Sequence, residues 1–202
     1  MPVRDEKMKV SKQKAAEHRK QIIAAAANKF REKGFDGISV ADLMKEAGLT
    51  HGGFYGHFSS KQELMGLASR QALRETANKW EKVIGEAPDK PLEALAKSYL
   101  SARHHSHPET GCLFAALGSD LARQPNSVKE AVMEGQLAII DVISRVVPGK
   151  TKAARRKQAV AVLAELIGGM VLARSVSDAA LSEEILKAVS ASVANGVHAD
   201  AS

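Results

Sequence analysis

The sequence predicts an all-α protein with an N-terminal three-helix domain and a C-terminal helical bundle. Aromatic residues make up only 4% of the chain while Ala, Leu and Val are abundant, which suits packed helices better than sheets. Apolar residues recur at helical spacing, and no stretch alternates as a strand would. We place a helix-turn-helix domain at residues 11–60, a second helical domain at 61–200, and a flexible basic arm at 1–10.

The first helix is expected over Ser11–Lys33, where Gly34 ends it. Its buried face consists of apolar residues at helical spacing, namely Ile22, Ile23, Ala26 and Phe30. Residues 1–33 hold ten Lys or Arg against four Asp or Glu, whereas the rest of the chain holds nineteen of each. A basic patch on this helix is typical of phosphate contact, although for residues 1–10 alone a solubilising tail is the simpler interpretation.

Two short helices joined by a glycine turn are expected next. Ser39 caps the first of them, and its apolar stripe is Val40, Leu43, Met44 and Ala47. Gly48 supplies the left-handed stop, and Thr50 caps the second helix. Two helices joined this tightly form a helix-turn-helix, whose second helix enters the major groove of DNA.

The same segment resembles the DNA-binding signature of TetR-family transcriptional regulators. The matching stretches within residues 16–64 are 33–35, 39–43, 47–50, 54–58 and 60–64. His51 and Gly53 stand where that family often has a lysine or a small hydroxyl residue. The resemblance implies a DNA-binding regulator that dimerises through a four-helix bundle formed by its last two helices and their copies.

The candidate DNA contacts lie at the start of the second short helix. Gly52, Gly53 and Gly56 together cost about 2–3 kcal/mol of helix propensity relative to alanine. A close approach of the backbone to DNA explains that cost. The resemblance implies that Tyr55 and His57 face phosphates and that Lys61 binds one. The candidate DNA-binding residues are Ser39, Val40, Thr50, His51, Gly52, Gly53, Tyr55, His57 and Lys61; Phe54 and Phe58 are expected to pack inside.

A long helix is expected from Ser60 to about Ile84, where Ser60 and Glu63 have capping-box spacing and Gly85 follows the end. It is the only expected element long enough to touch both domains. A signal in the bundle is therefore expected to reach the DNA by displacing this helix.

The last two helices are expected at Lys152–Val176 and Ser182–Val197. Their apolar stripes make a candidate homodimer interface, with an intrachain core as the alternative, and a palindromic operator favours the dimer. Gly168 and Gly169 would allow a neighbouring helix to approach closely. The stripe residues are Val162, Leu163, Leu166, Ile167, Met170 and Val171 on one helix, and Ile185, Leu186, Val189 and Val193 on the other.

An effector pocket is expected among the helices of the C-terminal domain. Its candidate lining residues, which would serve equally as core, are Trp80, Leu100, Cys112, Phe114, Met133 and Met170. Cys112 at a helix N-terminus is either a redox sensor or a buried, inert thiol. The cluster His104, His105 and His107, with Glu109 nearby, is interpreted as a solvated tract rather than a zinc site, so no metal or cofactor is expected.

Several protein classes find little support in the sequence. A single cysteine excludes an intramolecular disulfide framework and fits the cytoplasm, and the charged N-terminus has no signal-peptide core. The apolar run Ala159–Ala173 contains Glu165 and is too short for a membrane span. No paired carboxylates, Gly-x-Ser-x-Gly elbow or phosphate loop suggests an enzyme. A hydrolase using Cys112 and His105 would need an orienting group that we cannot assign.

We therefore expect a sequence-specific DNA-binding transcriptional regulator, a homodimeric repressor released from a palindromic operator by a small molecule or a redox signal. The alternatives are a Cys/His-dependent hydrolase and a nonspecific architectural DNA-binding protein. The latter would share the basic arm but would not require the large C-terminal bundle.

Overall fold

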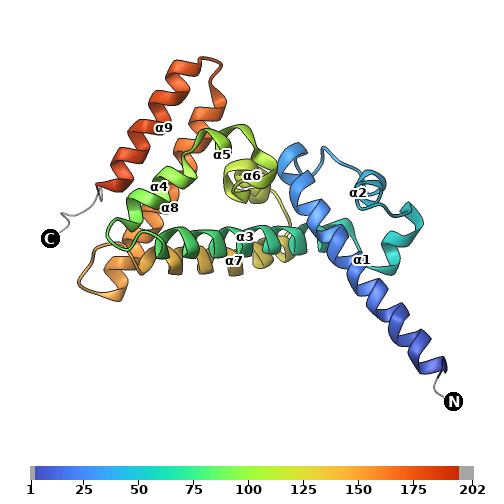
Figure 1. The fold of residues 1–202 in the computed structure, drawn as a ribbon. Coiled ribbons are helices and arrows are strands. Elements are labelled where there is room, and N and C mark those ends of the chain that lie inside the picture. The colour runs from blue at the N-terminus through green and yellow to red at the C-terminus, as the bar shows by residue number, and fades with distance from the viewer. Residues whose placement is uncertain (1–2, 196–202) are drawn as a thin grey trace.

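The computed structural model describes residues 3–195, with side chains from Gln13 onward, and its regular elements are all helical in that part of the chain. The predicted all-α class is confirmed. Figure 1 shows α1 and α2 at the N-terminal end of the molecule and the larger helical bundle beside them. In chain order the elements are α1 (Val3–Lys33), α2 (Val40–Glu46), the 3₁₀ helix η1 (His51–Gly56), α3 (Lys61–Gly85), α4 (Pro91–Tyr99), α5 (Ala102–Ser106), the 3₁₀ helix η2 (Pro108–Thr110), α6 (Leu113–Ala122), α7 (Asn126–Ser144), α8 (Lys152–Ser175) and α9 (Ala179–Ala194).

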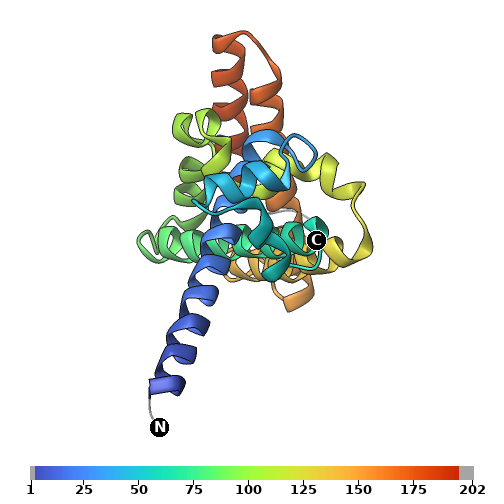
Figure 2. The same cartoon turned by 90° about the vertical axis from the view of Figure 1, so that its right-hand side faces the viewer.

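Helix α1 is longer than the sequence analysis predicted. It begins at Val3 rather than Ser11, so residues 3–10 are helical instead of forming a flexible arm, while Met1 and Pro2 lie outside the described residues. No glycine or proline interrupts the chain between Pro2 and Gly34, and Lys, Glu and Met are good helix formers. Figure 2 shows the first turns of α1 projecting away from the rest of the molecule.

The N-terminal core forms where α1, α2, η1 and the start of α3 meet. The predicted buried face of α1 is confirmed, and its side chains pack on those of the other three elements. The largest fully buried side chains here are Ile22, Phe30, Phe35, Leu43, Met44, Phe54 and Leu64. Because these side chains come from four elements, the core holds the two short helices in a single arrangement.

Helices α3 and α7 lie side by side and run in the same direction (Figure 1). Gly66 lies against Ala131, and an ion pair of 3.1 Å joins Arg145 to Glu81 near the other end. A Cβ on Gly135 would come within 2.5 Å of Leu73 Cβ, so only glycine allows the two helices to pack this closely.

Helix α9 packs against α8 on one side and α4 on another. It begins at Ala179, three residues before the predicted start, because the carboxylate of Asp178 accepts a hydrogen bond from the Leu181 N–H at 2.7 Å and caps the helix. It ends at Ala194, and the predicted end at Val197 lies outside the described residues.

Helix α8 is long and apolar enough to cross a membrane, judged by length and composition only. That is weak evidence, because the core helix of a soluble protein passes the same test. Its buried side chains, including Leu166 and Met170, pack within the bundle. The apolar character of α8 is accounted for by a core on one side and the exposed face described below on the other.

Candidate nucleic-acid interface and regulatory site

The turn between α2 and η1 has the predicted geometry at two of its three key residues. The Ser39 hydroxyl accepts a hydrogen bond from the Asp42 N–H at 3.1 Å and caps α2, and Gly48 has a φ of +71°. Thr50, in contrast, makes no side-chain capping bond, which corrects the prediction. The element after it is a six-residue 3₁₀ helix, since three of its six residues are glycine, a poor α-helix former.

The outward face of η1 is formed by small or exposed residues. His51, Gly52 and Gly56 are exposed, and Tyr55 is 73% exposed, the highest value among the large hydrophobic side chains. A Cβ on Gly52 or Gly56 would meet nothing within 4 Å. Phe54 and Phe58 point inward and are buried, as predicted. The backbone of η1 is therefore open to a partner while two phenylalanines anchor it from below.

Half-buried Gly53 would place a Cβ 3.6 Å from Met44, so it faces α2 more than solvent. Val40, at the start of α2, is half-buried and packs against the core. The Ser39 hydroxyl donates to the Asp42 carboxylate at 2.6 Å, and this bond is the main cause that lowers the pKa of Asp42. These three predicted DNA-binding residues are thus partly engaged within the chain.

Lys61, predicted to bind a phosphate, donates a hydrogen bond from Nζ to the Ile38 carbonyl at 2.8 Å. One of its three ammonium hydrogens is therefore used to tie α3 to the start of α2. Glu63 accepts from the backbone N–H and the hydroxyl of Ser59, both at 2.7 Å, and these bonds lower its pKa. The reciprocal half of the predicted capping box is thus made to Ser59 instead of Ser60.

Arg19 on α1 was not singled out from the sequence, yet it lies beside η1. It donates to the Glu63 carboxylate at 3.2 Å and to the His57 carbonyl at 3.4 Å, and its guanidinium stacks 5.0 Å from the Phe58 ring centroid. The ring of His18 lies 6.3 Å from that of His57. The side of η1 is therefore bordered by α1 side chains, which the helical spacing of α1 alone does not reveal.

The six predicted effector residues do not come together. Trp80 and Cys112 line one small cavity, and Leu100 lines a different groove. Met170 is fully buried, and Phe114 is half-buried. Met133 is 55% exposed on α7, so its place in a pocket was predicted wrongly. Other residues of α7 are buried, and the helix packs against α3. Because α7 has apolar residues on more than one side, its periodicity does not reveal which side is buried.

The small cavity, which we name the Tyr99 cavity, has a volume of about 30 Å³. His104 forms part of its wall and is bonded at both ring nitrogens. Nδ1 lies 2.6 Å from the Tyr99 carbonyl, and Nε2 accepts the Cys112 N–H at 2.9 Å. Burial lowers the pKa of His104 to about 4, so the ring is neutral at pH 7. The cavity is lined by Thr76, Lys79, Trp80, Ser98, Tyr99, His104, Thr110, Gly111 and Cys112.

The other two histidines of the predicted tract have separate partners. His105 Nε2 lies 3.1 Å from the Ala173 carbonyl and 3.2 Å from the Ser182 hydroxyl, which joins α5 to α8 and α9. His107 Nδ1 contacts the Arg103 carbonyl at 3.0 Å. The interpretation as a fully solvated tract therefore needs correction, since His104 is buried and His105 half-buried in these contacts.

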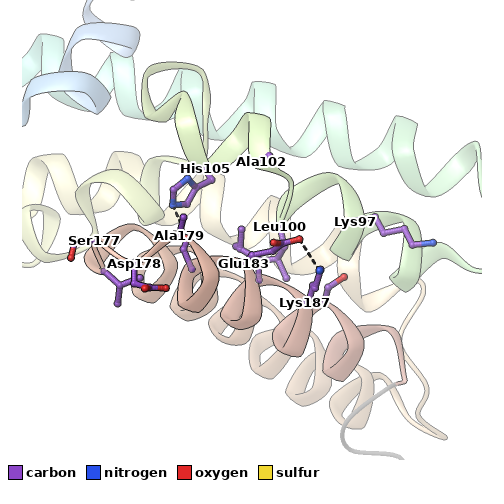
Figure 3. A pocket seen from close by; sticks show the side chains of 13 residues that line it. Lys97, Leu100, Ala102, His105, Ser177, Asp178, Ala179, Glu183 and Lys187 are labelled. Carbon is purple, nitrogen blue, oxygen red and sulfur yellow. Dashed lines mark hydrogen bonds and ion pairs between the residues drawn. The ribbon is translucent and has the colours of Figure 1, made fainter.

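A larger groove of about 610 Å³ opens between α4, α5 and α9 (Figure 3). Its basic residues are paired with carboxylates on their own helices: Lys187 with Glu183 at 2.7 Å, and Lys97 with Glu93 at 2.6 Å. The groove is lined by Lys97, Leu100, Ala102, His105, Val176, Ser177, Asp178, Ala179, Ser182, Glu183, Leu186, Lys187 and Ser190.

Helix α3 is not the only link between the domains, contrary to the sequence analysis. Arg31, at the end of α1, is buried and donates to the Gly111 carbonyl at 2.9 Å and to Asn28 at 2.7 Å. Arg174 on α8 donates to the carbonyls of His105, at 3.1 Å, and His104. The segment 101–112 is thus held by an arginine from each side. Arg31 lies four residues after buried Ala27, so helical spacing could have placed it on the inner face.

The predicted interface stripe on α8 and α9 is mostly intrachain core. Met170 is fully buried, and a Cβ on Gly169 would come within 2.9 Å of Val189, which shows how closely α8 and α9 pack. A Cβ on Gly168, in contrast, would meet nothing within 4 Å. An exposed, mostly apolar face remains on the far side of the pair. This outer face comprises the exposed Val160, Ala164, Val171 and Leu172 of α8 and Leu181 of α9, together with the half-buried Gly168.

Residues 22–67 match the family described as "Bacterial regulatory proteins, tetR family". YdgC, an uncharacterized HTH-type transcriptional regulator of Bacillus subtilis, is 42% identical over 53 residues, which cover 26% of this chain and 27% of YdgC. TtgR, an HTH-type transcriptional regulator of Pseudomonas putida, is 41% identical over 66 residues, 33% of this chain and 31% of TtgR. The matches span less than half the length of these relatives.

Solved structures resemble the chain over most of its length. The reduced form of NemR from E. coli has a TM-score of 0.74 and 19% identity, covering 89% of this chain and 97% of NemR. A TetR-family transcriptional regulator from Agrobacterium tumefaciens has a TM-score of 0.67 and 22% identity, covering 89% and 99%. At such low identity the likeness extends to the fold, both domains included.

Proposed function

We propose that this chain, whose residues 22–67 match the tetR family of bacterial regulatory proteins, is a homodimeric transcriptional repressor of that family. In this proposal it binds a palindromic operator in the cytoplasm, has no enzymatic activity, and leaves the operator when a small molecule binds the C-terminal domain. KstR2 of Rhodococcus jostii, a relative 30% identical over 91 residues, is named as a repressor.

The observation that carries the proposal is the exposed, glycine-containing face of η1. The buried Phe54 and Phe58 fix η1 on the domain, while His51, Gly52 and Tyr55 face solvent. An element of this kind, following a short helix and a tight turn, can enter the major groove. Lys61, which follows η1 in the chain and donates only to a backbone carbonyl, supplies positive charge for a phosphate, whereas Arg19 beside η1 is paired with Glu63.

A second copy of the chain is the proposed occupant of the outer face of α8 and α9. Val171 and Leu172 are 42% and 57% exposed, and Leu181 is 43% exposed, so large apolar side chains on both helices are open in the single chain. Gly168 lies among them and would let the partner's helix approach. A two-fold axis through this face would present two η1 elements to two operator half-sites.

For the releasing signal, a small molecule is better supported than oxidation. Cys112 is 3% exposed and sits at the cap position of α6, so an oxidant reaches its thiol only if the segment 101–112 moves. The redox alternative has a direct test with peroxide. We expect peroxide to release neither the wild-type protein nor the Cys112→Ser variant from the operator. Release of the wild type alone would establish Cys112 as the sensor.

The proposal is tested by selecting DNA from a random pool with the purified protein. We expect one palindromic sequence to be enriched, with half-site centres about 34–36 Å apart. Enrichment of no sequence, with tight binding to any DNA, would favour the architectural alternative instead.

A further inference from the structure

Buried polar atoms without a hydrogen-bond partner gather around residues 98–112. Among the described residues, the Tyr99 hydroxyl, Arg31 Nε and Arg174 Nη1 are buried and unpartnered. The two arginines hold opposite sides of this segment through its backbone carbonyls. Buried polar groups in folded proteins are nearly always satisfied, so three such atoms in one region indicate a missing partner.

The Tyr99 cavity offers the space for that partner. Tyr99 is 3% exposed and lines the cavity, whose volume of about 30 Å³ exceeds what a single water needs. Aromatic rings pack edge-on around the tyrosine, Trp80 at 5.5 Å and His104 at 4.5 Å between ring centroids. Burial, followed by the charge of Cys112 and a contact between its thiol and the phenol, raises the pKa of Tyr99, so the phenol keeps its proton at pH 7. That contact does not meet the geometry of a hydrogen bond, so the hydroxyl still has no proper partner. The fixed ring therefore presents its hydroxyl as an oriented hydrogen-bond donor.

The charges near the cavity are mainly positive. Lys79 lines it, and Lys79, Arg31 and Arg174 each lower the pKa of His104, after the larger effect of burial. Neither guanidinium forms an ion pair with a carboxylate among the described residues. Burial lowers the pKa of both arginines, and Glu109 opposes that shift from a distance but bonds to neither. The two arginines do not line the cavity themselves, but a cavity lined by a lysine and a buried phenol hydroxyl is suited to an anion.

We propose that the Tyr99 cavity binds the carboxylate group of a small organic acid, with the Tyr99 hydroxyl donating a hydrogen bond to it. The proposal rests on the proposed function in one respect, namely that this acid is the effector. A carboxylate there lies against Gly111 and Cys112, next to the carbonyl that Arg31 holds. Displacing that carbonyl would loosen the end of α1 and thereby the DNA-binding domain.

The larger groove of Figure 3 is the less suitable site for an acid. Its lysines Lys97 and Lys187 are already paired with glutamates, and Asp178 adds a further negative charge to its lining. Binding of acids there, away from Trp80, would leave the fluorescence signal described next unchanged.

The chain contains one tryptophan, Trp80, and it forms a wall of the cavity, so its fluorescence reports occupancy directly. The wild-type protein is titrated with acetate, propionate and benzoate, against acetamide, propionamide and benzamide, at an ionic strength held constant with sodium chloride. We expect a saturable change for at least one acid, with at least tenfold weaker binding of its amide. Equal binding of acid and amide, or no saturable change with any acid, would overturn the proposal.

Tyr99→Phe removes only the hydroxyl and is matched by Tyr55→Phe on the exposed face of η1. We expect the first variant to weaken acid binding at least fivefold while its melting temperature stays at or above that of the wild type. The second variant should leave acid binding unchanged. Unchanged affinity in Tyr99→Phe overturns the assigned role of the hydroxyl.

Operator binding, measured separately, distinguishes this inference from the function on which it rests. If the protein binds DNA selectively but binds none of the acids, the cavity proposal is wrong and the proposed repressor function stands. If it binds an acid but selects no operator, the repressor function is wrong and the cavity proposal stands.

Discussion

The end proposed to bind DNA and the end proposed to bind the effector, called the DNA-binding end and the regulatory end, differ in how their polar groups are bonded. Around η1 the polar side chains are bonded: Lys61 to the Ile38 carbonyl, Glu63 to Ser59, and Arg19 to Glu63. Around residues 98–112 the Tyr99 hydroxyl and one nitrogen of Arg174 are buried without a partner. The contrast indicates that the first region is already arranged for its ligand, whereas the second is completed only when one binds.

The largest effect is expected where the regulatory end meets its proposed copy. Val171→Glu places a charge on the outer face and should give a folded monomer with operator affinity reduced about 1,000-fold, or about 4 kcal/mol. Met133→Glu, at an exposed apolar position on α7, is the control and should remain dimeric. Sedimentation and operator titration check both variants, and an intact dimer of Val171→Glu would move the interface elsewhere.

A second prediction concerns the DNA-binding end. Gly52→Glu adds a carboxylate on open η1, where a Cβ meets no atom within 4 Å, so folding should be unaffected. Repulsion from phosphates should reduce operator affinity about 100-fold, or about 2.7 kcal/mol. Gly118→Glu, at an equally open glycine on α6, should bind as the wild type does. Equal losses in both variants would show that general charge, and not η1, is responsible.

Because His104 is neutral in the folded protein, we expect the free energy of unfolding to depend on pH. Its pKa is lowered to about 4 by burial from its ordinary value of 6.5, so the unfolded chain binds the extra proton first. Stability should therefore fall as the pH drops below 6.5, by about 2 kcal/mol between pH 7 and pH 5. Urea unfolding measures this, and His104→Gln should lack that part of the decline. An imidazole signal of His104 that titrates near pH 6.5 would contradict the assignment.

Arg31 joins the two ends, so its removal should weaken their connection. Arg31→Met loses the bond to the Gly111 carbonyl and should cost about 1.5 kcal/mol of unfolding free energy. Its greater effect should be on communication: the effector would still bind, with less loss of operator affinity. Lys33→Met, at an exposed residue of the same helix, serves as the control. If the effector fully releases Arg31→Met from the operator, the signal passes between the domains through α3 and not through Arg31.

The smallest expected effect concerns the Tyr99 hydroxyl in the absence of ligand. Because this group is buried without a partner, Tyr99→Phe should raise the free energy of unfolding, by about 1 kcal/mol. A bonded hydroxyl would give the opposite sign. Chemical denaturation of the ligand-free protein decides between them, and a clear loss of stability would remove the contrast between the two ends.

Much of the local structure was predictable because its causes are local. The cap at Ser39, the left-handed Gly48 and the cap at Ser60 depend on residues within a few positions of each other, and the structure has all three. The inward packing of Phe54 and Phe58 likewise follows from their spacing. The 3₁₀ form of η1 and the missing cap at Thr50 were not foreseen, because three glycines in a short element leave its form to its surroundings.

The sequence by itself determined the fold class, most helix boundaries and the segment proposed to face DNA, since periodicity, caps and turns act along the chain. Only the tertiary structure decided which side of each helix is covered. Gly168 and Gly169 are neighbours in sequence, yet one is open and the other packs on Val189. The same holds for Met133, which is exposed, and Arg31, which reaches Gly111 across eighty positions. A helix with apolar residues around most of its circumference can be buried on either side, and contacts between distant segments select one.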